Sequence, residues 1–326
     1  MKRLLMMIVT VLVLAACGGN DGGESSSNGE SNLEDLFITI ATGGTSGVYY
    51  PLGASIGTIL EDEIGADTSV QATQASVENV NLVLNGQAEL ALITGDTAYQ
   101  AYEGVGPFED EGEQKDLQAI AALYPNYLHV VTTEDSGIKT FADLKGKKVA
   151  VGAPNSGTEL ASQVLLEGHG MSYDDIKPDY LSFAESVDQM KNGLVDAAIL
   201  SSGIPNAGLM DLDTTHKIQL IPIEDDAMEK LTEEYSYLIE TTIPADSYSV
   251  EEDVKAIEIT NTMIVNQDLS EEAVYEITKA FFENLDVLSE THNVGKDIEL
   301  ERATEGLSVP LHPGAEKYYK EEGVLE

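Results

Sequence analysis

A pattern of strand, polar loop and helix occurs twice in this chain of 326 residues and restricts the folds open to it. The segments NGQAELALI (85–93) and NGLVDAAIL (192–200) align, and so do SVEN (76–79) and SVDQ (186–189), in the same order. Each pair lies in a run that alternates strand-like and helix-like segments. Such alternation is typical of parallel sheets with right-handed helical crossovers. The sequence therefore predicts two α/β lobes of like topology.

The two runs predict matching elements. In the first run we expect strands at 36–40, 68–72 and 89–94 and helices at 50–63 and 76–84. In the second run we expect strands at 148–152, 179–183 and 196–200 and helices at 160–168 and 186–191. Apolar strands at 117–129 and 254–265 connect the lobes, and Ser270 caps a long amphipathic helix at 270–291. The predicted lobes are 36–123 with 255–326, and 124–254, with the two crossover strands as a hinge.

The amino terminus has the pattern of an exported lipoprotein. Lys2 and Arg3 precede an apolar run at 4–16, and the run ends in Leu-Ala-Ala before Cys17, the only cysteine. We expect a signal peptide at 1–16, a diacylglycerol on Cys17 and a flexible Gly/Ser-rich tether at 17–35. An ordinary secretory signal with an incidental cysteine is the alternative. The predicted location is the extracytoplasmic face of the cell membrane, with the lipid as the only membrane contact.

The charge and the cysteine count exclude several classes of function. A formal net charge of −41 argues against a nucleic-acid partner, which needs clustered Lys and Arg. The acidity indicates either a solvated surface or a salty habitat. One cysteine rules out a disulfide within the chain, and the five scattered histidines show no metal-ligand spacing. We expect no metal and no cofactor.

Polar, glycine-containing loops follow four of the expected strands, at 43–47, 94–96, 155–158 and 201–206. In open parallel sheets, ligands bind outside the carboxyl ends of the strands. Helices that begin there present unsatisfied N–H groups and partial positive charge, which favour an anion. The loop GGTSG (43–47) lacks the lysine of a phosphate-binding P-loop but can hold a carboxylate with its amides and hydroxyls. Ordinary strand-to-helix turns use the same residue types and are the alternative.

The predicted ligand-binding residues lie in or beside these loops. They are Gly44, Thr45, Ser46, Gly47, Tyr49, Ser76, Thr94, Asp96, Tyr124, Ser156, Gly157, Thr158, Ser201, Gly203 and Pro205. Asp96 either takes an amino group of the ligand or caps the next helix. The rings of Tyr49, Tyr50 and Tyr124 either line the pocket or pack in the core. For His129, on a crossover strand, we expect a satisfied place in the core.

The chain resembles the solute receptors of the TRAP-TAXI transporter family from about residue 38 to residue 319. The resemblance is carried by GGTSGVYYPLG, SVENVNL, GDTAYQAY, LYPNYLHVV, DLKGKKVAVGAPNSGTE, YLSFAESVD, IPNAG, VYEITKAFFENL and PLHPGAEKYY. It implies an α/β, two-lobed type II periplasmic-binding-protein fold. It also implies capture of a glutamate-like or dicarboxylate-like molecule and its delivery to a TRAP-type permease driven by an ion gradient. The lipoprotein signal departs from the soluble receptors of Gram-negative cells and suggests a cell without an outer membrane.

Two other functions were weighed against a receptor. A hydrolase in the same cleft would need a nucleophile and a base, yet the chain has no G-x-S-x-G elbow and no Ser–His–Asp order. A surface adhesion lipoprotein would not need four converging polar loops. We therefore expect a small-molecule receptor that is not an enzyme.

Overall fold

The computed structural model describes residues 36–326. The predicted signal peptide, tether and Cys17 lie outside the described residues. The strands are β1 (Phe37–Ala41), β2 (Asp67–Gln71), β3 (Leu90–Thr94), β4 (Gln118–Thr133), β5 (Lys148–Ala150), β6 (Lys177–Asp179), β7 (Ala197–Ser202), β8 (Ile218–Leu220), β9 (Ile239–Ile243) and β10 (Val254–Val265). Within the described range these ten strands form one sheet, whose main path runs β2-β1-β3-β10-β4-β7-β5-β6.

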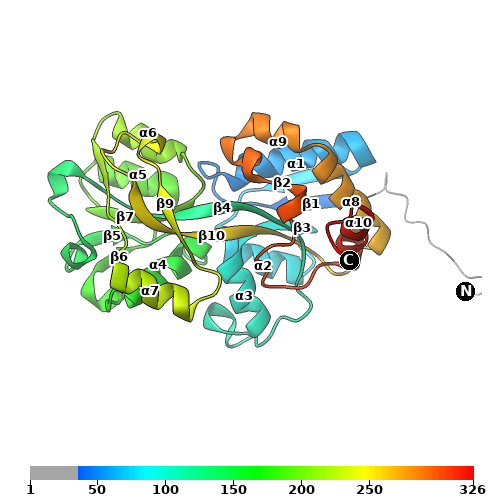
Figure 1. The fold of residues 1–326 in the computed structure, drawn as a ribbon, viewed down its shortest axis with the longest axis horizontal. Helices are drawn as coiled ribbons and strands as arrows, with labels where there is room; N and C mark the ends of the chain where they lie inside the picture. The colour runs from blue at the N-terminus through cyan, green and yellow to red at the C-terminus, as the bar shows by residue number, and fades with distance from the viewer. Residues whose placement is uncertain (1–35) are drawn as a thin grey trace, which may run out of the picture. The chain divides into compact units, whose positions relative to one another are not determined.

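Helices cover both faces of this sheet (Figure 1). They are α1 (Tyr49–Ile64), α2 (Ser76–Leu84), α3 (Gly95–Glu103), α4 (Gly157–Gly168), α5 (Phe183–Lys191), α6 (Ala207–Asp213), α7 (Asp225–Glu234), α8 (Glu271–Glu283), α9 (Leu285–Thr291) and α10 (Pro313–Glu321). In the described part of the chain, no helix combines the length and apolar character needed to cross a bilayer.

The two predicted runs fold into units of the same topology. In the first unit (37–94), β1 lies between β2 and β3 and pairs parallel with both. In the second unit (148–202), β5 lies between β6 and β7 and again pairs parallel with both. The echoes in the sequence fall on equivalent elements, since SVEN and SVDQ lie in α2 and α5, and the longer pair leads into β3 and β7.

The long strands β4 and β10 join the two units. They pair antiparallel with each other, and Figure 1 shows them running together between the units. The inner strand of the first unit, β3, pairs antiparallel with β10, while the inner strand of the second unit, β7, pairs antiparallel with β4. Apolar side chains on the two faces of each half of the sheet form four buried clusters, centred on residues such as Ile40, Val80, Leu165 and Leu200. Burial of these faces against the helices is the main stabilising term of the fold.

Among the expected elements that differ from the structure, two have a clear local cause. The helix expected at 270–291 is divided into α8 and α9 at Asn284, which has non-helical dihedrals of φ −126° and ψ 32°. Asn side chains compete for backbone hydrogen bonds, and the Asn284 amide donates to the Ala280 carbonyl oxygen at 2.9 Å. In place of the strand expected at 179–183, β6 runs from Lys177 to Asp179, and Ser182 and Glu185 then form a capping box that begins α5.

Candidate functional site

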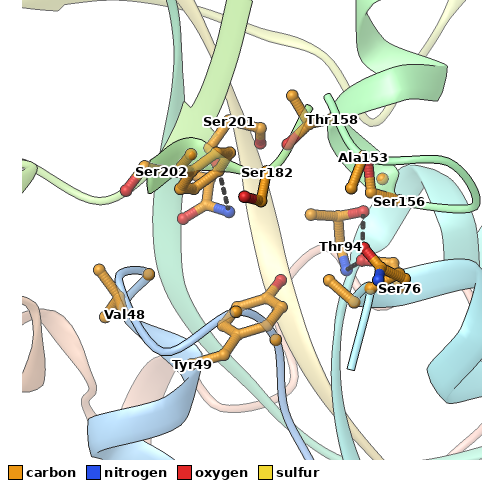
Figure 2. Close-up of a pocket in the computed structure, with 18 of the residues that line it drawn as sticks. Val48, Tyr49, Ser76, Thr94, Ala153, Ser156, Thr158, Ser182, Ser201 and Ser202 are labelled. Atoms are coloured by element: carbon orange, nitrogen blue, oxygen red, sulfur yellow. Dashed lines mark hydrogen bonds between the residues drawn. The ribbon is translucent and has the colours of Figure 1, made fainter. Parts of the chain in front are cut away.

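A cavity of about 440 Å³ lies between the two units. It is lined by Gly43, Gly44, Ser46, Gly47, Val48, Tyr49, Thr73, Gln74, Ala75, Ser76, Thr94, Tyr124, Asn126, Ala153, Ser156, Gly157, Thr158, Ser182, Phe183, Glu185, Ser201 and Ser202. Figure 2 shows Val48 and Tyr49 on one side of this space and Ser201 and Ser202 on the other. Both units therefore contribute walls to one cavity of a size that suits a small molecule.

The walls are the loops that follow the parallel strands and open the next helices. The first loop turns at Gly44, whose carbonyl oxygen accepts from the Gly47 amide at 2.9 Å, and α1 then begins without a side-chain cap. In the second unit, Ser156 caps α4 by accepting from the Glu159 amide at 3.2 Å. Helices α2 and α5 also begin at the cavity. Several helix N-termini, with their free N–H groups and partial positive charge, thus face one space.

The two units approach closely at the start of α4. A Cβ built on Gly157 would lie 2.4 Å from the Thr94 hydroxyl oxygen and 2.9 Å from that of Ser76. Only glycine fits there without displacing a neighbour. The backbone is also strained beside this contact at Ala75, with φ of 74° and ψ of −146°, whereas Asn155 has a φ of 62° that asparagine adopts readily. Strain in residues other than glycine is concentrated at functional sites, which supports a role for this junction.

Three polar side chains form what we call the floor of the cavity: Tyr124 and Asn126 on β4 and Ser201 on β7. Their exposed fractions are 0 %, 4 % and 5 %. The hydroxyl of Tyr124, the Oδ1 of Asn126 and the hydroxyl of Ser201 have no hydrogen-bond partner among the described residues. Because buried polar groups in proteins are nearly always paired, these three unpaired atoms beside a cavity make the floor a candidate for ligand contact.

The cavity contains no cationic side chain. Among its described lining residues there is no Lys, Arg or His, and Glu185 is the acidic one. The carboxylate of Glu185 accepts from the hydroxyl of Ser182 at 2.6 Å and from the Ser182 amide at 2.9 Å, and these bonds lower its pKa. Any anion bound here would be held by neutral donors. The described residues also include no group of three His, Cys, Asp or Glu side chains placed to hold a metal ion.

Most of the predicted ligand-binding residues are brought together in this cavity. Those that line it are Gly44, Ser46, Gly47, Tyr49, Ser76, Thr94, Tyr124, Ser156, Gly157, Thr158 and Ser201. Thr45, Asp96, Gly203 and Pro205 do not line it. Thr45 is exposed at the tip of its loop, and Gly203 and Pro205 follow the end of β7, where a Cβ on Gly203 would meet Val294 at 2.5 Å. Tyr50, too, lies outside the lining.

Asp96 is not the N-cap of a helix and is not among the residues that line the cavity. The N-cap of α3 is Thr94, and Asp96 lies inside the first turn, buried to 1 % exposure. Its Oδ1 accepts from the Thr97 amide at 2.8 Å. Burial raises the pKa of Asp96 to about 6, although hydrogen bonds from Thr94 and Thr97 oppose this. Its charge raises the pKa of Tyr49 and Tyr237 further, beyond the effect of their burial.

His129 has the satisfied core position that the sequence suggested. It is fully buried, its Nδ1 lies 2.9 Å from the Tyr127 carbonyl oxygen, and its Nε2 lies 3.0 Å from the Tyr248 hydroxyl. The Nδ1 must carry the proton, since a carbonyl only accepts, so Nε2 accepts from Tyr248. Burial lowers the pKa of His129 to about 4 and keeps the ring neutral.

Several lining residues were missed by the sequence reasoning. They are Val48, Thr73, Gln74, Ala75, Asn126, Ala153, Ser182, Phe183 and Glu185, whereas Gly43 and Ser202 lie in the loops predicted at 43–47 and 201–206. The segments 73–75 and 182–185 follow β2 and β6, so the rule about the carboxyl ends of strands would have found them. They were passed over because neither contains a glycine.

Comparisons with known proteins agree with this architecture. A model of the NMT1-like family matches residues 40–323. A stretch of 68 residues, 21 % of this chain and 21 % of the relative, is 40 % identical to the "Putative aliphatic sulfonates-binding protein" of Escherichia coli (strain K12). Among solved structures, one from Bordetella bronchiseptica RB50 has a TM-score of 0.54 at 18 % identity, with 90 % of each chain covered.

A second solved structure, described as a periplasmic transporter, also has a TM-score of 0.54, at 12 % identity, and covers 88 % of this chain and 92 % of that one. Likeness at such low identity shows the fold alone. It confirms the predicted α/β fold of the periplasmic-binding-protein type, with β4 and β10 as the crossover strands. The matched family covers the crossover strands, both units and the cavity between them, but does not single out the TRAP-TAXI receptors. The chain belongs to the NMT1-like family.

Proposed function

We propose that this protein is an extracytoplasmic receptor that captures a small organic anion and presents it to a membrane permease. The observation that carries the proposal is the cavity between the two units, lined by hydroxyls and helix N-termini from both and by no cation. Each helix terminus favours a nearby negative charge by about 0.3–1 kcal/mol, and several act together here. A carboxylate of a glutamate-like or dicarboxylate-like molecule fits this chemistry.

The loop at 43–47 and the start of α4 would hold that carboxylate. Gly44 and Ser46 contribute from the first unit, and Ser156, Gly157 and Thr158 from the second. The related Escherichia coli protein is described as binding aliphatic sulfonates. A sulfonate has the same charge and accepts the same hydrogen bonds, so it belongs in the same test. The resemblance to TRAP-TAXI receptors supports a TRAP-type permease as the partner, and no side chain of the cavity suggests an enzyme.

Calorimetry of the purified protein with glutamate, succinate and ethanesulfonate tests the proposal. We expect saturable binding of at least one of these anions, with the ligand recovered unchanged. Gly44→Val tests whether the loop holds the ligand, because a Cβ at Gly44 meets no atom of the protein within 4 Å. This variant should lose binding and keep its thermal transition, since the added side chain enters open space at the cavity. Conversion of a ligand to product, or a bound structure with an arginine on the carboxylate, would contradict the proposal.

The place of the receptor in the cell is part of the same proposal. The Leu-Ala-Ala-Cys motif supports lipidation of Cys17 and attachment to the extracytoplasmic face of the cell membrane. Replacement of Cys17 by serine should move the protein from the membrane fraction to the medium. A Cys17→Ser protein that still sediments with membranes would show that the lipid is not the anchor.

A further inference from the structure

The floor of the cavity carries information about the ligand beyond its anionic group. Three atoms there are buried and unpaired: the hydroxyls of Tyr124 and Ser201 and the Oδ1 of Asn126. All three residues line the cavity. They lie on strands β4 and β7, whereas the proposed anion donors lie at helix starts. The floor is therefore a second group of contacts, separate from the amides at 43–47 and at the start of α4.

The orientation of the Asn126 amide decides which of its two polar atoms is left without a partner. Its Nδ2 donates to the Ser201 carbonyl oxygen at 3.4 Å. A reversed amide would bring Oδ1 against that carbonyl, with two acceptors facing each other. The hydrogen-bond network thus leaves Oδ1 as the unpaired atom of this lining residue, and an amide oxygen is an acceptor that cannot donate.

The two hydroxyls of the floor can act as donor or as acceptor, whereas the Oδ1 of Asn126 can only accept. A hydroxyl donates or accepts by rotating, so Tyr124 and Ser201 match many groups. The Oδ1 of Asn126 needs an N–H or O–H from the ligand. An ionised carboxylate only accepts, so it would leave this buried oxygen facing another acceptor. No described cation lines the cavity to offset that cost.

We propose that the floor is a ligand subsite that selects a hydrogen-bond donor, namely a hydroxyl, amide or ammonium group, and rejects a second carboxylate. Asn126 is its specificity-determining residue. This inference rests on the proposed function, and it narrows the ligand class to small acids that carry a donor group. A plain dicarboxylate is excluded unless its second acid group is protonated.

Matched acids of increasing length test the subsite. Binding is measured for butyrate, 4-hydroxybutyrate, 4-aminobutyrate and succinate, and for the corresponding three-carbon and five-carbon sets. At one length at least, we expect the hydroxy or amino acid to bind tenfold or more tightly than both the plain acid and the diacid. If the plain acid or the diacid binds as well at every length, the floor assignment is wrong while the receptor function stands. If none of these acids binds but ethanesulfonate does, the floor assignment is wrong and the receptor function stands. If glutamate and ethanesulfonate also fail to bind, the proposed function fails, and the subsite with it.

Two variants test whether the floor residues cause the preference for donor-bearing acids. Asn126→Leu should reduce the affinity ratio between donor-bearing and plain acid to near one. Tyr124→Phe should weaken binding of the donor-bearing acid several-fold without lowering the melting temperature of the empty protein, because its hydroxyl has no partner there. The control is Tyr319→Phe, which removes a buried hydroxyl that donates to the Ile120 carbonyl oxygen at 2.8 Å. Tyr319→Phe should lower the melting temperature and leave the affinity ratio between donor-bearing and plain acid unchanged. A Tyr124→Phe protein with undiminished selectivity and reduced stability would overturn the assignment.

Discussion

The Nδ2 of Asn261 on β10 donates a hydrogen bond of 2.8 Å to the carbonyl oxygen of Tyr124 on β4. The register of the two strands shifts at this point, since Thr260 pairs with Pro125 but Thr262 pairs with Ala122. Two residues of β4 therefore face one residue of β10, which is a β-bulge. Bulges interrupt the ladder and re-aim side chains, often beside binding sites. Here the bulge places Tyr124 in the floor of the cavity, and Asn261 satisfies the carbonyl group that the ladder leaves free.

Removal of this amide should damage both the fold and the site. The hydroxyl of Tyr49 donates to Asn261 Oδ1, so Asn261→Leu leaves that hydroxyl and the Tyr124 carbonyl unpaired. We expect the free energy of unfolding in urea to fall by about 1–3 kcal/mol and the ligand affinity to fall with it. Asn266→Leu is the control, because Asn266 is also buried and donates to the Val83 carbonyl oxygen at 3.0 Å, away from the cavity. Its affinity should be unchanged. Normal binding by Asn261→Leu would show that the bulge does not position the site.

The contact between Gly157 and the first unit gives a second prediction. In Gly157→Ala the new Cβ would lie 2.4 Å from the Thr94 hydroxyl oxygen, so α4 must shift away from the cavity wall. We expect binding at least about tenfold weaker, equivalent to about 1.4 kcal/mol, because the two sets of donors no longer converge. The control is Gly208→Ala near the start of α6, where the nearest atoms are 3.2 Å from the added Cβ. Unchanged affinity in Gly157→Ala would mean that the ligand does not use donors from both units.

Much of this fold could be predicted from the sequence because its elements are strongly patterned. The bounds expected for α2 and β10 match the structure residue for residue. The strand expected at 117–129 is shorter than β4, which continues to Thr133 after the chain enters the second unit. Helix α4 begins at Gly157 rather than at residue 160, because Ser156 supplies the cap. Propensity and periodicity locate elements well, but caps and tertiary contacts set where they end.

The site was predicted in part for a similar reason. Loops rich in glycine and serine are visible in a sequence, and those at 43–47 and 155–158 proved to line the cavity. Asn126 was not predicted, because it lies within the crossover strand β4 and not in a glycine-containing loop. Asp96 was placed in the site, although the structure buries it in the first turn of α3, behind Thr94. In a strand, a shift of the pairing register by one residue moves each side chain to the other face of the sheet, so local sequence does not settle which residues of β4 reach the cavity.

The buried carboxyl of Asp96 predicts a pH dependence of stability. Its pKa is about 6 in the folded protein against 3.8 in the unfolded chain, because burial penalises the charged form. The folded state thus retains a proton that the unfolded state loses between these values. The stabilisation from protonated Asp96 is fully present below pH 4 and is lost as the pH rises through 6. The difference between these two pKa values corresponds to roughly 3 kcal/mol.

The variant Asp96→Asn isolates this effect. Asparagine can still accept from the Thr97 amide but carries no charge to bury. We expect Asp96→Asn to gain stability relative to the parent between pH 4 and 6 and to remain more stable up to pH 8. The difference curve is needed because His129, with a pKa of about 4, makes stability rise with pH between 4 and 6.5 and opposes Asp96 in the parent protein. A difference that is flat with pH would show that Asp96 is already ionised in the acidic range.

The last prediction is that ligand binding draws the two units together about β4 and β10. The candidate donors are divided between the units, and the strands that join the units carry the register shift at Thr260–Thr262. A ligand that contacts both units shifts the equilibrium only by its differential affinity for the closed form. A receptor that is about 1 % closed when empty needs about 5.5 kcal/mol of preference to become 99 % closed. Two or three charge-assisted hydrogen bonds from the second unit, at about 1.5–3 kcal/mol each, supply that amount.

Small-angle scattering with and without ligand measures this closure directly. We expect the radius of gyration to fall at saturation, and we expect the fall to be smaller in Thr158→Val, which removes one hydroxyl donor of the second unit from the cavity. Thr158→Val should also bind the ligand more weakly, because the contacts that stabilise the closed form are the same contacts that hold the ligand. The hydroxyl of Thr132, which donates to the Asp196 carbonyl oxygen at 2.8 Å away from the cavity, provides the control variant Thr132→Val, with normal closure. A radius of gyration that stays constant while the ligand saturates the parent protein would instead indicate a rigid site, in which the donors of both units are already in place.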